Sequence, residues 1–227
     1  MEAPKFVLFG LDHLAALALT GLAAVALSAV ARRDPEGRAA TGVRLALAGI
    51  LIAAIGIGLW RDALRGRLSP WDFVPLNLCD FAILLAAFSL ATRRQSAYEL
   101  LYFWALAGTF IAMVTPDVTR GFPSWQFISF FAFHGAVVVA ALFLTLGLKM
   151  RPRAGSPWRV FVWTNLYAAI AAAVNFAFER NFLYLREKPD GPSVLDWLGP
   201  WPWYLVGAEV LALALFLLLD LPFRAKR

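Results

Sequence analysis

Two side chains in this sequence have the chemistry of a nucleophile and its base. Cys79, the only cysteine, lies in the stretch PLNLCD, and His134 lies in FFAFHG. A thiolate attacks acyl carbonyl groups, and a histidine within reach takes the thiol proton and later returns one to the leaving group. Cys79 follows Pro75 near the expected start of a helix, where the positive end of the helix dipole favours the thiolate. The pair therefore predicts acyl transfer through a thioester.

The side chains that could bind a metal do not form a recognisable site. A single cysteine excludes an internal disulfide and any multi-cysteine metal site. Cys79, Asp80, His134 and His13 could formally supply the three protein ligands of a zinc hydrolase, but their spacing matches no metal signature. The sequence also lacks a glycine-rich phosphate loop or a nucleotide fingerprint. We therefore expect neither a metal nor another cofactor.

The composition places these residues in a membrane protein. The chain has 227 residues, of which 61% are hydrophobic, and its mean hydropathy is +0.68. A span needs about 20 mainly apolar residues, and the runs are continuous and rich in Ala and Leu, unlike the alternation of a membrane barrel. We predict one integral membrane domain over residues 1–227, an all-α bundle of about seven transmembrane helices. The predicted spans are Phe6–Val30, Val43–Trp60, Phe73–Thr92, Leu100–Thr115, Trp125–Leu148, Trp158–Phe178 and Pro202–Leu219.

The basic residues predict the orientation of this bundle. The formal net charge is +6, but Lys and Arg lie in the short connections rather than in a nucleic-acid-binding cluster. Thirteen of them lie on the side of the C-terminus and eight on the side of the N-terminus. By the positive-inside rule, the N-terminus is outside and the C-terminus inside. We expect no nucleic-acid partner.

The ionisable residues within the predicted spans lie at similar depth. With a helical rise of about 1.5 Å per residue, they fall about 10–14 Å below the outer interface. Such groups usually face a cavity or the bundle interior. We therefore predict a polar cavity open to the outer side, ringed by spans one, three, five and seven. The residues are Asp12, His13, Asp80, His134 and Glu209, with Asp117 and Glu179–Arg180 at the rim.

The remaining polar residues receive supporting roles in this hypothesis. An orienting group could hold the histidine, and an outer arginine could hold the phosphate of a lipid. The orienting candidates are Asn77, Asp80, Asp117 and Glu209, and the headgroup-binding candidates are Arg180 and Arg186. The expected substrate of a pocket at this depth is an acyl lipid.

Two other functions fit the same residues. A proton-coupled transporter or carrier could use Asp12, Asp80 and Glu209, and a non-catalytic membrane scaffold needs none of them. Each residue also has a structural reading. Cys79 could be an inert small side chain, Asp80 a helix cap or ion-pair partner, and Glu209 a hydrogen-bonding link between helices.

Several stretches together resemble one protein family over nearly the whole chain. PLNLCD, LLYFWALAGTFIAMVTPD, FFAFHG, NFLYLREKP and LGPWPWY are similar to the bacterial YwaF-like integral membrane family, which is related to eukaryotic transmembrane protein 164. The eukaryotic relatives are similar in architecture to the androgen-induced-gene hydrolases, which use Thr and His. The resemblance implies acyl transfer onto lysophospholipids, with Cys79 matching the nucleophile and His134 the base. It also implies a multi-pass protein of the bacterial cytoplasmic membrane that acts on phospholipid or lysophospholipid.

Overall fold

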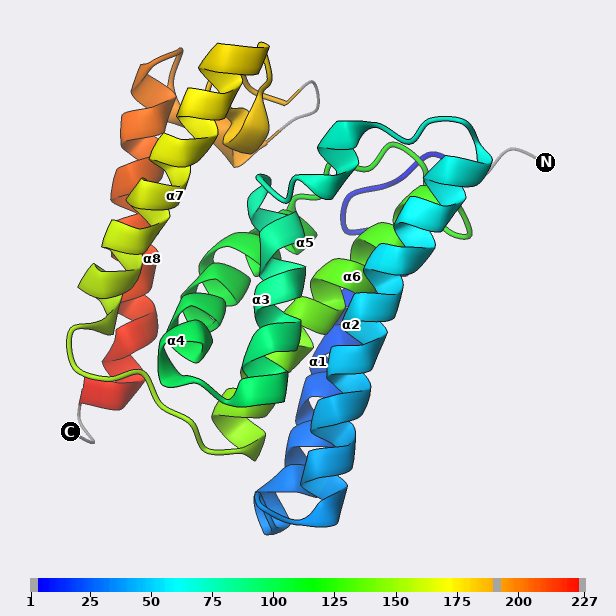
Figure 1. Cartoon of the computed structure of the whole chain (residues 1–227), viewed down its shortest axis with the longest axis vertical. Coiled ribbons are helices and arrows are strands. Elements are labelled where there is room, and N and C mark those ends of the chain that lie inside the picture. Colours follow the sequence, from blue (N-terminus) through cyan, green and yellow to red (C-terminus); the bar gives the residue numbers. More distant parts are fainter. Residues whose placement is uncertain (1–3, 190–192, 225–227) are drawn as a thin grey trace.

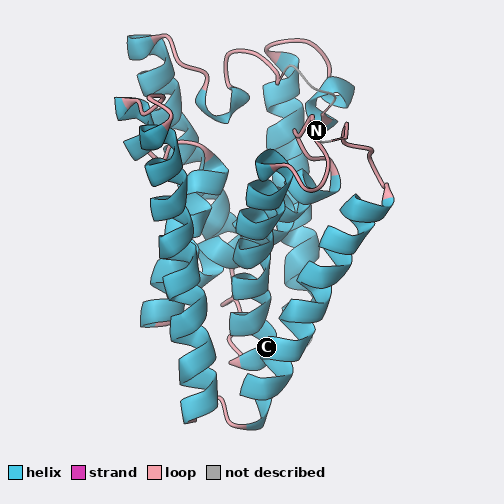
Figure 2. Cartoon of the chain, turned by 90° about the vertical axis from the view of Figure 1, so that its right-hand side faces the viewer, coloured by secondary structure: helices cyan, strands magenta, loops and turns pink. Residues whose placement is uncertain are grey.

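Seven apolar helical spans build the molecule, as the hydropathy of the sequence predicts. The computed structural model describes residues 4–189 and 193–224. These residues contain no strand, and one isolated bridge pairs Lys5 with Arg120 (Figure 2). The helices long and apolar enough to cross a membrane are Leu11–Arg33, Arg38–Leu64, Pro70–Thr92, Gln95–Val114, Trp125–Gly147, Ser156–Phe178 and Trp203–Arg224.

Four of the spans are single α-helices and three are composite. The single helices are α1 (Leu11–Arg33), α2 (Arg38–Leu64), α7 (Ser156–Phe178) and α8 (Trp203–Arg224). The third span joins the 3-10 turn η1 (Pro70–Phe73) to α3 (Leu78–Thr92). The fourth consists of α4 (Gln95–Trp104), the π segment η2 (Ala105–Thr109) and α5 (Phe110–Val114). The fifth joins α6 (Trp125–Leu142) to the π segment η3 (Phe143–Gly147). Two further 3-10 turns, η4 (Phe182–Tyr184) and η5 (Val194–Leu198), precede α8.

The third and fourth spans start at other residues than predicted. The α-helix of the third span begins at Leu78 rather than Phe73, because residues 70–73 form a 3-10 turn and Pro75 lies between the two elements. The Ser69 side chain caps that turn by accepting a hydrogen bond from the Trp71 backbone N–H (3.3 Å). The fourth span begins at Gln95 instead of Leu100, and this brings Glu99 into the helix.

The spans divide into a body and a peripheral pair. α6 contacts α1, α2, α3 and α4, and η2 also packs against it, so α6 lies at the centre of the body. α7 and α8 pack against each other and lie at one side (Figure 1). Large apolar side chains such as Val162, Phe176 and Val210 remain exposed on this pair. Apolar exposure on this scale is what a lipid-facing surface requires.

The two ends of the bundle carry different connections. We call the end at which α1 begins the N-terminal end, and the opposite end, where α8 finishes, the C-terminal end (Figure 1). Connections 65–77, 115–124 and the described parts 179–189 and 193–202 of the last one lie at the N-terminal end, and the short turns 34–37, 93–94 and 148–155 lie at the C-terminal end. The predicted orientation places the N-terminal end outside the cell.

Candidate functional site

A cavity of about 640 Å³ lies at the N-terminal end, where a polar site is expected. α2, η1, α3 and α6 line it together with the turn that follows α7. Spans one, three, five and seven were predicted to ring the cavity. Only the third and fifth contribute lining residues, and α1 and α8 contribute none. Its polar lining residues are Asp62, Asp72, Asn77, Asp80, Arg180 and Asn181, and its aromatic ones are Trp71, Phe73, Phe133 and Phe182.

Cys79 sits in the first turn of α3, between two residues that line this cavity. Asn77 is the N-cap of α3, and its side-chain amide donates a hydrogen bond to the Asp80 carboxylate (3.0 Å). The thiol is half-buried and is not itself part of the lining. The local turn is held from α7, because the Tyr167 hydroxyl donates to the Pro75 carbonyl (2.6 Å).

His134 lies on α6 in a tautomer suited to a base. Its Nδ1 is 2.8 Å from the Phe130 carbonyl, one turn earlier, and the ring stacks on the Phe130 ring at 4.0 Å. Because a carbonyl only accepts, Nδ1 carries the proton and Nε2 keeps its lone pair. α3 and α6 pack against each other, but across the described residues no hydrogen bond joins the Cys79 thiol to the His134 ring.

Arg180 is fixed at the wall of the same cavity. Its guanidinium lies over the Trp71 ring, 4.6 Å from the centroid, and Trp71 in turn contacts Phe178 and Phe182. The stack holds the cation in place without neutralising it. Asp62, by contrast, lies 3.6 Å from both Arg61 and Arg67, a long distance for an ion pair.

His134 and the other predicted site residues do not line this cavity. Asp117 is exposed and is not part of the lining. Glu209 accepts a hydrogen bond from the Asn165 side chain (3.0 Å), which links α8 to α7. Arg186 lines a separate cavity of about 300 Å³ that also includes Glu179. His13 is fully buried, with Nδ1 accepting from the Phe9 N–H (2.9 Å) and Nε2 donating to the Met113 carbonyl (2.8 Å), which is a structural arrangement.

Sequence reasoning missed two buried carboxylates near the C-terminal end. Glu99 is 2% exposed and Asp220 is 3% exposed. Each lies one residue outside a predicted span, because those spans were bounded at Leu100 and Leu219. Buried ionisable side chains therefore lie near the C-terminal end as well as near the N-terminal end.

Glu99 is the centre of an ionic cluster. It accepts hydrogen bonds from the Arg153 backbone N–H and Nε (2.9 and 2.8 Å) and from Arg159 (3.2 Å). The carboxylate raises the pKa of Arg153, which lies in the connection outside the spans. The sequence signal was present: Gln95 and Glu99 are one helical turn apart, and three arginines follow the next span within 13 residues of its end.

Comparison with known proteins shows the family of this chain. No solved structure matches the chain. The chain is 29% identical over 221 residues to an uncharacterized protein of Treponema pallidum (strain Nichols), covering 96% of this chain and 90% of that protein. The model of the TMEM164 family matches residues 8–220. With seven membrane-spanning helices and a match over nearly its whole length, the chain belongs to the TMEM164 family.

Proposed function

We propose that the protein transfers or hydrolyses acyl groups of membrane phospholipids, with Cys79 as nucleophile and His134 as general base. One observation carries the proposal: a 640 Å³ cavity with polar and aromatic walls reaches the end of the bundle beside Cys79. Its lining includes Asn77, two residues before the thiol, and Asp80, directly after it. We place the protein in the bacterial cytoplasmic membrane, with this cavity on the outer side.

The chemistry requires two steps at one sulfur. In the first, Nε2 of His134 takes the Cys79 proton, directly or through one water, and the sulfur attacks the ester carbonyl carbon. The carbon–oxygen ester bond breaks, the leaving alkoxide takes the proton from His134, and a thioester remains on Cys79. In the second step an acceptor hydroxyl loses its proton to His134 and attacks the thioester. The carbon–sulfur bond breaks, and the thiolate recovers the proton. Water as acceptor gives hydrolysis.

The proposal requires that the Cys79 thiol and the His134 ring come within hydrogen-bonding reach, directly or through one water, when the substrate binds. Catalytic hydrogen bonds are often long in structures without substrate and tighten when it binds. The tautomer of His134 already presents the free lone pair of Nε2, since Nδ1 is engaged with the Phe130 carbonyl. Asn77 and Asp80 hold each other at the turn that carries the thiol, and this supports an orienting role for both.

The charges of the cavity favour a zwitterionic headgroup. Three carboxylates, those of Asp62, Asp72 and Asp80, line it with one guanidinium, that of Arg180. A headgroup with one phosphate and one ammonium group matches this set, with the phosphate at Arg180 and the ammonium near the carboxylates and aromatic rings. A purely anionic headgroup would meet three like charges.

The test is covalent labelling of the purified protein by a phospholipid with a radiolabelled acyl chain. We expect a thioester on the wild type that hydroxylamine removes, and no label on Cys79→Ala. His134→Ala should label at least tenfold more slowly, since general-base catalysis contributes about 10²–10⁴-fold. Equal labelling of the wild type and both variants would refute the mechanism.

Two arginines provide a matched pair for the headgroup. Arg180 lines the large cavity and Arg186 does not, although both lie in the same connection. Arg180→Ala should therefore raise the phospholipid concentration needed for half-maximal labelling, whereas Arg186→Ala should leave it unchanged. The opposite ranking would move the headgroup to the smaller cavity.

A further inference from the structure

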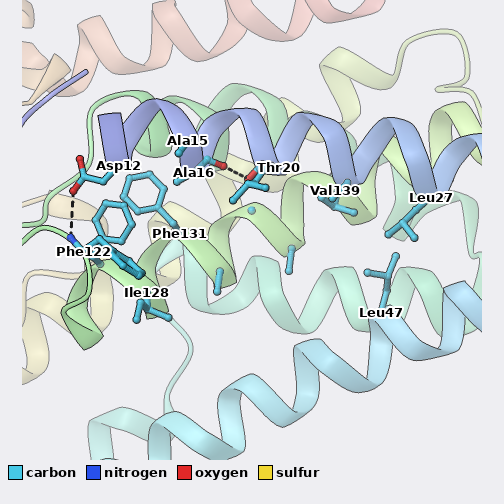
Figure 3. A pocket seen from close by; sticks show the side chains of 16 residues that line it. Asp12, Ala15, Ala16, Thr20, Leu27, Leu47, Phe122, Ile128, Phe131 and Val139 are labelled. Atoms are coloured by element: carbon cyan, nitrogen blue, oxygen red, sulfur yellow. Dashed lines mark hydrogen bonds between the residues drawn. The ribbon is translucent and has the colours of Figure 1, made fainter. Parts of the chain in front are cut away.

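A second cavity, of about 570 Å³, runs along the other side of α6 and takes no part in the proposed reaction. Figure 3 shows its side chains in a row between α1 and α6, with Phe122 and Asp12 at one end and Leu27 and Leu47 at the other. We call it the α1–α6 groove. On α6 the groove is lined by residues such as Phe131 and Gly135. The cavity of about 640 Å³ described above is instead lined by Phe133, which lies on another face of the same helix.

The groove has no polar group in need of a partner. Asp12 and Thr20 are the only polar side chains among the lining residues. The Asp12 carboxylate accepts a hydrogen bond from the Phe122 N–H (3.2 Å), and the Thr20 hydroxyl donates to the Ala16 carbonyl (2.9 Å). Water in such a place would find almost no hydrogen-bond partners, so an apolar occupant is favoured.

The length of the groove fits a long hydrocarbon chain. Asp12 and Leu27 are 15 residues apart on α1, so the groove is ~22 Å long. The length also exceeds the ~15 Å of hydrocarbon in one leaflet, so a long chain is needed to fill it.

The mouth of the groove carries two cations beside the Asp12 carboxylate that lines it. Lys5 and Arg120 face each other across the isolated bridge at the N-terminal end, and both are exposed. This bridge lies beside the Asp12 end, because a Cβ added to Gly121 would come within 2.9 Å of the Asp12 carboxylate and 3.3 Å of the Lys5 carbonyl. Two cations next to the entrance of an apolar groove suit a phosphate attached to an acyl chain.

We propose that the α1–α6 groove binds one phospholipid as a resident ligand, with an acyl chain along Ala132, Gly135 and Ala136 and the phosphate near Lys5 and Arg120. The lipid is held as a structural or regulatory partner and is not the substrate. This inference stands independently of the acyl-transfer proposal, since neither Cys79 nor His134 lines the groove.

The experiment is a titration of the full chain in mild detergent with dioleoyl phosphatidylglycerol, followed by native mass spectrometry. Ala132→Phe places a ring on the groove floor, and Ala53→Phe adds the same ring at an exposed position of α2 outside every cavity described above. Wild type and Ala53→Phe should bind one lipid with equal affinity. Ala132→Phe should bind it about tenfold more weakly, by the cost of overfilling a packed site.

Several results would overturn the inference. They are the absence of a saturable lipid adduct on the wild type and equal binding by Ala132→Phe. If the Phe variant does not fold, Ala132→Val adds only two methyl groups and should weaken binding in the same direction. Labelling of Cys79 is measured separately, so failure of one proposal is distinguishable from failure of the other.

Discussion

Replacement of Glu99 by glutamine tests how the C-terminal end of the bundle is held together. The carboxylate side chain is 3% exposed, while its partners Arg153 and Arg159 are 56% and 44% exposed. Glutamine keeps the size of the side chain and one acceptor oxygen. It removes the charge and replaces the second oxygen by an NH2 group, which cannot accept a hydrogen bond from Arg159.

The expected loss of stability depends on how far Glu99 and its two arginine partners are buried. Breaking a fully buried ion pair costs about 3–5 kcal/mol, and hydrogen bonds to charged groups contribute about 1.5–3 kcal/mol each. Since water screens the half-exposed guanidinium groups, we expect about 2 kcal/mol for Glu99→Gln. For a chain of this length, that corresponds to a fall in Tm of about 4–8 °C. Differential scanning fluorimetry of the purified protein in detergent measures it.

The Glu36–Arg93 pair supplies the control. Its ions are 2.6 Å apart, but the Glu36 side chain is 74% exposed. Arg93 lowers the pKa of Glu36, so the stabilisation is present above the ordinary pKa of a glutamate and disappears as the pH falls through the lowered one. At neutral pH, Glu36→Gln should change Tm much less than Glu99→Gln. Equal shifts for the two variants would show that burial of Glu99 contributes nothing.

Two further substitutions test the packing of α1. His13→Phe keeps an aromatic ring but removes both hydrogen bonds of the imidazole, including that to Met113. It should destabilise the fold by about 2–3 kcal/mol in the same thermal assay. An unchanged Tm would rule out a structural role for the histidine. Gly135→Ala places a Cβ 2.8 Å from the Thr20 hydroxyl and should cost about 1–2 kcal/mol. Gly49→Ala, with nothing within 4 Å of the new Cβ, should be neutral or stabilising, and a similar loss at both glycines would contradict close α1–α6 contact.

The membrane spans were predictable because a bilayer imposes a length and a composition on each segment separately. Trp125–Leu148, for example, was predicted and Trp125–Gly147 is found. A sliding window fails where a charge inside a helix is neutralised by residues far along the chain. Glu99 is paired with Arg153, 54 residues later, so the start of its span was placed at Leu100. This ion pair is a tertiary contact, which the hydropathy of a local stretch of sequence does not reveal.

The height of a residue along its helix was predictable, but the direction in which its side chain points was not. Counting residues from the start of a span gives height along the helix axis, and a polar cavity does lie at the N-terminal end. Of the ionisable residues predicted within the spans, Asp80 lines it, whereas Asp12, His13, His134 and Glu209 do not. The rotation of each helix about its axis depends on packing against its neighbours. Glu209 has the expected height, yet it turns toward Asn165 on α7. Tyr167, which holds the turn before Cys79, carried no signal because one tyrosine in a span resembles any interfacial aromatic residue.

The two ends of the bundle differ in a way that bears on the carrier hypothesis. At the C-terminal end, Glu99 binds two arginines, and the Tyr98 hydroxyl donates to the Met150 carbonyl (3.0 Å), so the 148–155 connection is fastened onto α4. At the N-terminal end, both large cavities reach the connections. Alternating access requires a site near the midplane that can open to either side. Two cavities that reach the connections at one end, above a fastened opposite end, do not match that requirement.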